Sequence, residues 1–145
     1  HAGYLAKQIR EFISGARVDA VMMSMVGNLS EQDILDVAAY YESQTPAPAI
    51  ASEDNLALGE AIYRGGIESA GVAACYACHG PAGKGNPGAG YPALAGQNAE
   101  YTAQTLIDFR SGARANDENA AMRDLVKRMT DEEIAAVSNY IQGLN

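Results

Sequence analysis

Two cysteines three positions apart, followed directly by a histidine, are the residues of this chain best suited to chemistry. Cys75, Cys78 and His79 stand in the stretch CYACHG, and the chain has no other cysteine. One turn of helix presents both thiols, which can add across the two vinyl groups of a porphyrin edge. The imidazole that follows then binds the iron from one side. The pentapeptide therefore predicts covalent attachment of haem c.

Three other interpretations of these residues compete with haem attachment. A thioredoxin-like redox pair needs a βαβ context, and no alternating strand pattern of useful length is present. A zinc site needs a second ligand pair at a distance, and the only other histidine is His1. A structural disulfide, or a pair of free thiols, leaves His79 unexplained. Haem attachment accounts for all three residues, and we favour it.

A haem iron with one histidine ligand needs a sixth ligand, and a methionine thioether is the natural choice. The chain offers methionines 22, 23, 25, 122 and 129. Met129 has the spacing of a core residue. Met122 follows the polar loop RANDEN and stands seven residues before Met129, as Met22 stands seven residues before Leu29. We predict that Met122 binds the iron; ordinary apolar packing is the competing interpretation.

Much of the sequence occurs twice. Residues 1–17 match residues 98–114 at eight positions with an offset of 97. The stretch that begins at Leu29 parallels the stretch that begins at Met129, now with an offset of 100. An insertion of three residues near 115–119 reconciles the two offsets. Each copy reads as helix, loop, helix, and only the second copy is preceded by the thiol motif.

Capping signals delimit the predicted helices. A Ser-Gly pair ends the first helix of each copy, and capping boxes open the second helices at Ser30 and Thr130. Asp54 or Asn55 is the expected cap of a short helix before the motif. Pro46 and Pro48 mark a linker. We therefore predict an all-α fold with three parts: a partial domain at 1–45, a linker at 46–54 and a complete haem domain at 55–145.

Charge and composition argue against several classes of function. The net charge of −8 argues against a nucleic-acid partner, because phosphate binding needs a basic face. No apolar run is long enough to cross a membrane, and no nucleophile stands with a suitable base. Several acidic side chains of the second copy are expected to form a solvated face, and a docking site for a basic partner is the alternative; among them are Asp117, Glu118, Asp131, Glu132 and Glu133.

The stretches CYACHG, YPALAGQ and FRSGAR, with the loop methionine, resemble those of class I c-type cytochromes and, more narrowly, of the dihaem cytochrome c4 family. The resemblance implies a class I cytochrome c fold whose C-terminal domain is complete and follows a partial copy of itself. It implies haem attachment at Cys75 and Cys78 and iron ligation by His79 and Met122. It also implies a pocket lined by Pro81, Tyr91, Pro92 and Leu94.

That family carries a second CxxCH in its first domain, and this chain does not. Met22 stands where the iron ligand of the first domain would be. We therefore expect a fragment of a two-haem protein with at least one covalent haem c, and two if the missing N-terminal part exists. The partial first domain is expected to pack on the second.

The resemblance implies an electron carrier rather than an enzyme. We expect a periplasmic protein, free or bound to the membrane surface, that shuttles single electrons between redox protein partners and a respiratory acceptor such as a terminal oxidase. One alternative is the haem subunit of an enzyme like flavocytochrome c sulfide dehydrogenase. Another is a ligand sensor in which Met122 is displaced.

Overall fold

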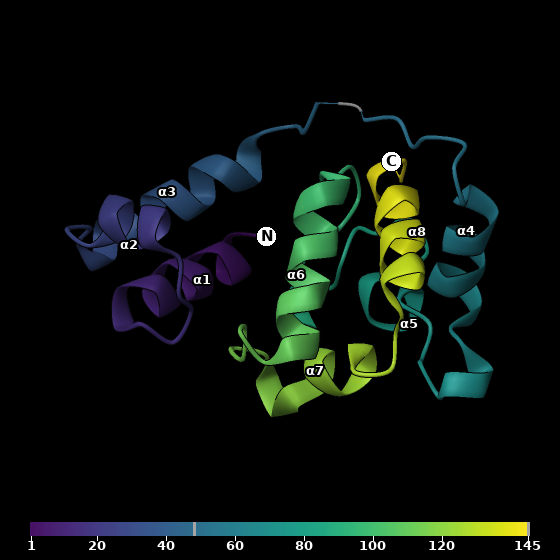
Figure 1. Cartoon of the computed structure of the whole chain (residues 1–145). Helices are drawn as coiled ribbons and strands as arrows, with labels where there is room; N and C mark the ends of the chain where they lie inside the picture. Colours follow the sequence, from purple (N-terminus) through teal and green to yellow (C-terminus); the bar gives the residue numbers. More distant parts are fainter. Residues whose placement is uncertain (48, 145) are drawn as a thin grey trace.

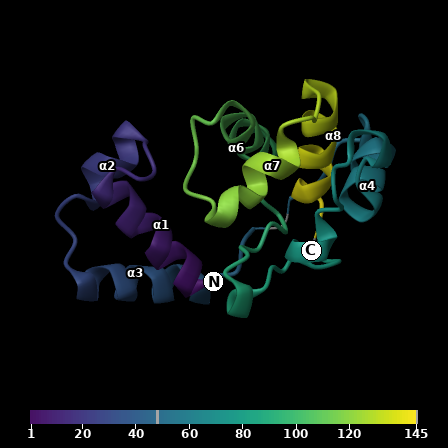
Figure 2. The ribbon, with the colours of Figure 1, turned by 90° about the horizontal axis from the view of Figure 1, so that it is seen from below.

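The structure is a computed structural model that describes residues 1–47 and 49–144, so the predicted linker residue Pro48 lies outside the described part. Two groups of helices lie side by side and are joined by an extended linker (Figure 1). The first group holds α1 (Ala2–Ser14), α2 (Ala20–Val26) and α3 (Glu31–Ser43). The second holds α4 (Leu56–Gly65), α5 (Tyr76–His79), α6 (Ala99–Ser111), α7 (Ala121–Val126) and α8 (Asp131–Gln142). The view from below shows the same separation (Figure 2).

The helix ends follow the capping signals of the sequence. Gly15 and Gly112 take the left-handed conformation, with φ of 80° and 81°, directly after α1 and α6. The capping boxes that open at Ser30 and Thr130 are both present. Asn55 occupies the N-cap of α4, one of the two predicted positions, but in a left-handed conformation and with no capping bond from its side chain.

Within the described ranges the regular structure is helical. Two isolated antiparallel bridges, Ile67 with Val72 and Asn86 with Tyr91, close tight turns in the long loops, and no strand forms. The all-α prediction is confirmed. None of the helices in the described part of the chain combines the length and the hydrophobicity that a membrane span requires.

Each group of helices has its own buried cluster. In the first group Ile9, Phe12 and Ile34 are among the buried residues, and in the second α8 is central, with Ile134 and Val137 almost fully buried. Close approach of α4 to α8 depends on a glycine. A Cβ added to Gly59 would lie 2.1 Å from the Ala136 carbonyl oxygen, so the two backbones meet where no larger residue fits.

The two groups meet through side chains that the sequence repeat relates to each other. Tyr4 and Arg17 of the first copy correspond to Tyr101 and Arg114 of the second. Arg17 donates to the Tyr101 hydroxyl and Arg114 to the Tyr4 hydroxyl, each at 2.9 Å. The contact is reciprocal, as a pseudo-two-fold relation between the copies requires.

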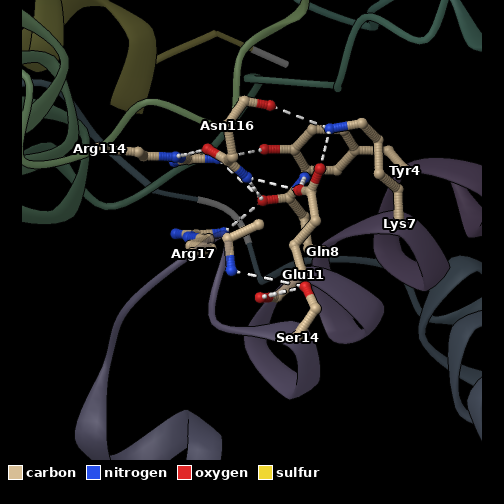
Figure 3. A network of polar contacts seen from close by, with 9 residues as sticks. Tyr4, Lys7, Gln8, Glu11, Ser14, Arg17, Arg114 and Asn116 are labelled. Carbon is tan, nitrogen blue, oxygen red and sulfur yellow. Dashed lines mark hydrogen bonds and ion pairs between the residues drawn. The ribbon is translucent and has the colours of Figure 1, made fainter.

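Arg114 is the more deeply buried of the two arginines, at 9% exposure. Its guanidinium donates to the Gln8 and Asn116 side chains at 3.0 and 2.9 Å. The Asn116 amide donates in turn to Gln8 and Glu11, and Lys7 reaches the Asn116 carbonyl at 3.0 Å. Figure 3 shows these side chains converging from α1 and from the loop after α6. The network fixes α1 against the second group.

We predict that Arg114→Ala lowers the free energy of unfolding by about 3 kcal/mol, because it removes a buried guanidinium together with its hydrogen bonds to Tyr4, Gln8 and Asn116. Arg17→Ala is the matched control: it too removes a guanidinium that stacks on a phenylalanine, but one less deeply buried. Its expected cost is about 1 kcal/mol. Denaturant unfolding of the haem-loaded protein measures both, and an equal or larger loss for Arg17→Ala would contradict this assignment.

Candidate functional site

The thiol motif forms one turn of helix. Cys75 is the N-cap of α5, and the His79 amide donates to the Cys75 carbonyl at 3.0 Å. The turn ends at Gly80, whose φ is 79°. Both cysteines are free thiols, with Cys75 half-buried and Cys78 exposed. The turn thus presents two thiols and the imidazole together, as the spacing predicts.

A hydrogen bond to the backbone orients the His79 ring. The side chain is 7% exposed, and its Nδ1 lies 2.9 Å from the Pro92 carbonyl oxygen. A carbonyl only accepts, so Nδ1 carries the proton and Nε2 keeps its lone pair. Burial lowers the pKa of His79, and the bond to Pro92 opposes this only in part. The ring is therefore held neutral, which is the form that binds a metal.

The glycine-rich loop after the motif places the Pro92 carbonyl. The Gly85 amide donates to the His79 carbonyl at 2.8 Å, with φ of 72° at Gly85. A Cβ at Gly85 would lie 2.6 Å from the Pro92 carbonyl carbon, so a side chain there would displace the acceptor of His79. The hydroxyl of Tyr63, which is fully buried, holds the Gly80 carbonyl at 2.7 Å. Burial raises the pKa of Tyr63 to about 12, so it remains a donor.

The motif opens onto a cavity of about 240 Å³. A single water needs only about 10–15 Å³, so the space suits a ligand rather than one solvent molecule. Most of the predicted site residues line this cavity: Cys75, Cys78, His79, Tyr91, Pro92, Leu94 and Met122. Apolar side chains of α6, α7 and α8 complete the wall, among them Leu106, Val126 and Ile141.

Two predicted residues lie elsewhere. Pro81 is exposed and does not line the cavity. Met22 is half-buried against the hydrophobic cluster of the first group. Sequence reasoning missed Tyr4, Gln8 and Arg114, which form a polar edge of the cavity. The signal was available for two of them, because Tyr4 and the repeat partner of Arg114 are among the positions that match between the copies.

The chemistry of the cysteine and histidine side chains favours haem attachment over the competing interpretations. Burial raises the pKa of the Cys75 thiol to about 11, opposite to the shift of a thioredoxin-type nucleophile. Across residues 1–47 and 49–144, no group of three or more histidine, cysteine or acidic side chains has the arrangement of a metal site. Two free thiols, a neutral imidazole and an apolar cavity fit a covalently attached haem.

Met122 lies near the start of α7, directly after a turn with a strained backbone. It is the second residue of α7 and is half-buried against the core of the second group. The two residues before α7, Asn119 and Ala120, have φ of 54° and 57°. This left-handed conformation costs about 1–2 kcal/mol for a residue with a side chain, and alanine has no polar group to offset it.

An ion pair between a buried carboxylate and a half-exposed guanidinium spans this turn. The Asp117 side chain is 5% exposed and accepts from the Arg123 amide at 3.0 Å and from Arg123 Nε at 2.7 Å. Burial alone would raise the pKa of Asp117, but the hydrogen bonds from the Arg123 backbone and side chain outweigh it, so the pKa is lowered. Asp117 is thus an anion at neutral pH and joins the two ends of the turn.

Comparison with known proteins agrees with this geometry. The family model for cytochrome c matches residues 57–145. The chain is 43% identical to cytochrome c4 of Azotobacter vinelandii, over 98% of this chain and 72% of that protein. It is 40% identical to a thiosulfate dehydrogenase electron acceptor of Stutzerimonas stutzeri, over 96% of this chain and 65% of that protein.

A solved structure shows the same arrangement over almost the whole chain. Reduced recombinant cytochrome c4 from Pseudomonas stutzeri superposes with a TM-score of 0.95 at 40% identity, over 99% of this chain and 81% of that one. The match includes the helices of the first group as well as the haem domain. The chain is therefore a member of the cytochrome c4 family of class I c-type cytochromes, the haem proteins that serve as electron carriers.

Proposed function

We propose that this electron carrier holds one haem c through Cys75 and Cys78, with His79 and Met122 as the iron ligands. The observation that carries the proposal is that these four residues, from two distant segments, line one largely apolar cavity. When bound, the haem supplies an iron that gains and loses one electron. His79 and the Met122 thioether would hold this iron, and the thioether would raise its reduction potential.

The first group of helices supports a proposal of a second haem in a longer form of the protein. Met22 has the same place in its copy as Met122, near the start of a short helix, and is half-buried against an apolar cluster. The cytochrome c4 relatives extend beyond the part that this chain matches. The domain limits 1–45, 46–54 and 55–145 remain our proposal, and the two separate buried clusters support them.

The segment that carries the motif is nearly uncharged, and we call its exposed side the uncharged face. Residues 69–99 contain one charged side chain, Lys84, apart from the neutral His79, in a chain of net charge −8. Cys78 and Tyr91 of this segment line the cavity and are exposed to solvent. We propose that electrons pass through this face to a partner with an uncharged docking patch, and that the acidic side chains elsewhere are solvated.

The relatives of this chain support a proposal about its electron donor. The similarity to a thiosulfate dehydrogenase electron acceptor favours a carrier that receives electrons from a separate enzyme over a permanent subunit of a flavoenzyme. We propose a membrane terminal oxidase as acceptor. We also propose a periplasmic location, since the covalent attachment of haem takes place outside the cytoplasm in the proteins that this chain resembles.

Met122→Ala tests the iron ligation. We expect the haem to stay covalently bound and the reduction potential to fall by more than about 60 mV, the one-electron equivalent of tenfold, because the thioether, which favours ferrous over ferric iron, is lost. Met129→Leu is the control, since Met129 is 4% exposed in the core, and its potential should stay close to that of the wild type. Spectroelectrochemistry measures both. A wild-type potential in Met122→Ala would show that another group is the ligand.

Ala89→Glu tests the uncharged face. A carboxylate there must lose its water when a partner docks, so we expect oxidation by membranes that contain a terminal oxidase to slow about tenfold. Ala47→Glu adds the same charge at an exposed position of the linker and should leave the rate unchanged. Equal rates for the two variants would place the docking surface elsewhere.

A further inference from the structure

The helices that carry Met22 and Met122, α2 and α7, begin with different capping arrangements. In the first copy Asp19 is the N-cap of α2, and its Oδ1 accepts from the Met22 amide at 2.8 Å. No residue with positive φ lies in that turn. The methionine of the first copy is therefore positioned by an ordinary capping bond, directly at the helix start.

The second copy has no such capping bond at the start of α7. The three extra residues of its loop place Ala120 at the N-cap of α7, and alanine has no capping group. The two positions before the helix are left-handed, and Ala120 is the one that resists this conformation most. The start of the helix that carries Met122 thus needs a restraint from outside its own cap.

Asp117 supplies the restraint. Its carboxylate reaches over the two left-handed residues and binds the backbone amide and the side chain of Arg123, the residue after Met122. The ring closed in this way contains Asn119, Ala120 and Met122. Asp117 and Met122 both line the cavity.

We infer that Asp117 is a positioning residue for Met122: its bonds to Arg123 hold a strained turn closed and keep the thioether at the haem iron. The inference rests on the proposed ligation by Met122. Without the carboxylate, the left-handed residues relax toward ordinary helix or extended backbone, and the start of α7 moves with them. The thioether then leaves the iron more readily.

The experiment uses the ferric, haem-loaded protein and imidazole as a competing ligand. Imidazole binds only where the thioether has left, so its apparent affinity measures the fraction of open iron. We expect Asp117→Asn to bind imidazole about tenfold more tightly than the wild type, with the haem still attached. Asp124→Asn is the control, because Asp124 lies on the same helix in an exposed pair with Lys127 and should behave as the wild type does.

A second variant separates positioning from a simple change of charge. Ala120→Gly removes the cost of the left-handed backbone, so the double variant Asp117→Asn with Ala120→Gly should regain most of the wild-type resistance to imidazole. An affinity in Asp117→Asn equal to that of the wild type, or no recovery in the double variant, would overturn the inference. The absence of the thioether-to-iron charge-transfer band in the wild type would instead refute the ligation by Met122, and the inference with it.

Discussion

The site depends on one hydrogen bond, from His79 Nδ1 to the carbonyl of Pro92. It decides which ring nitrogen carries the proton, and it leaves Nε2 free to bind iron. A loop with several glycines makes this possible, because at Gly85 the backbone comes too close to Pro92 for any side chain. The helical turn of the motif carries the His79 ring, and the hydroxyl of the buried Tyr63 fixes the end of that turn by donating to the Gly80 carbonyl. The thiols need only be present on the turn, whereas the imidazole has to be oriented.

The duplicated architecture gives the haem cavity a wall that a single domain lacks. Side chains of α1 line the cavity beside Arg114, and the reciprocal bonds of the two arginines to the two tyrosines fix that helix in place. The copies also differ in the turn that precedes the methionine. The first copy caps its helix with Asp19, and the second uses Asp117 across a longer and strained turn. The repeat thus preserves the contact between the copies, while the turn before the methionine differs.

Much of the fold can be predicted from local signals: glycines 15 and 112 end their helices, and Ser30 and Thr130 open theirs. Seven residues of the predicted site line one cavity, and they could be predicted because the sequence motifs of the family identify them. The rest of the site could not be predicted, because it depends on backbone groups and conformations that no residue type identifies. The acceptor of His79 is a backbone carbonyl, and the left-handed Ala120 has a side chain that favours other conformations. The cross-pairing of Arg114 with Tyr4 needs the relative placement of the two copies, which a linear repeat does not specify.

The most direct test of the account is the mass of the peptide that contains Cys75 and Cys78, after proteolysis of protein matured with haem. We predict that the peptide carries one haem through two thioether bonds, that the haem survives extraction with acidified acetone, and that replacing both cysteines with alanine releases it. An unmodified peptide of the wild-type protein, or haem that acidified acetone removes completely, would contradict the account.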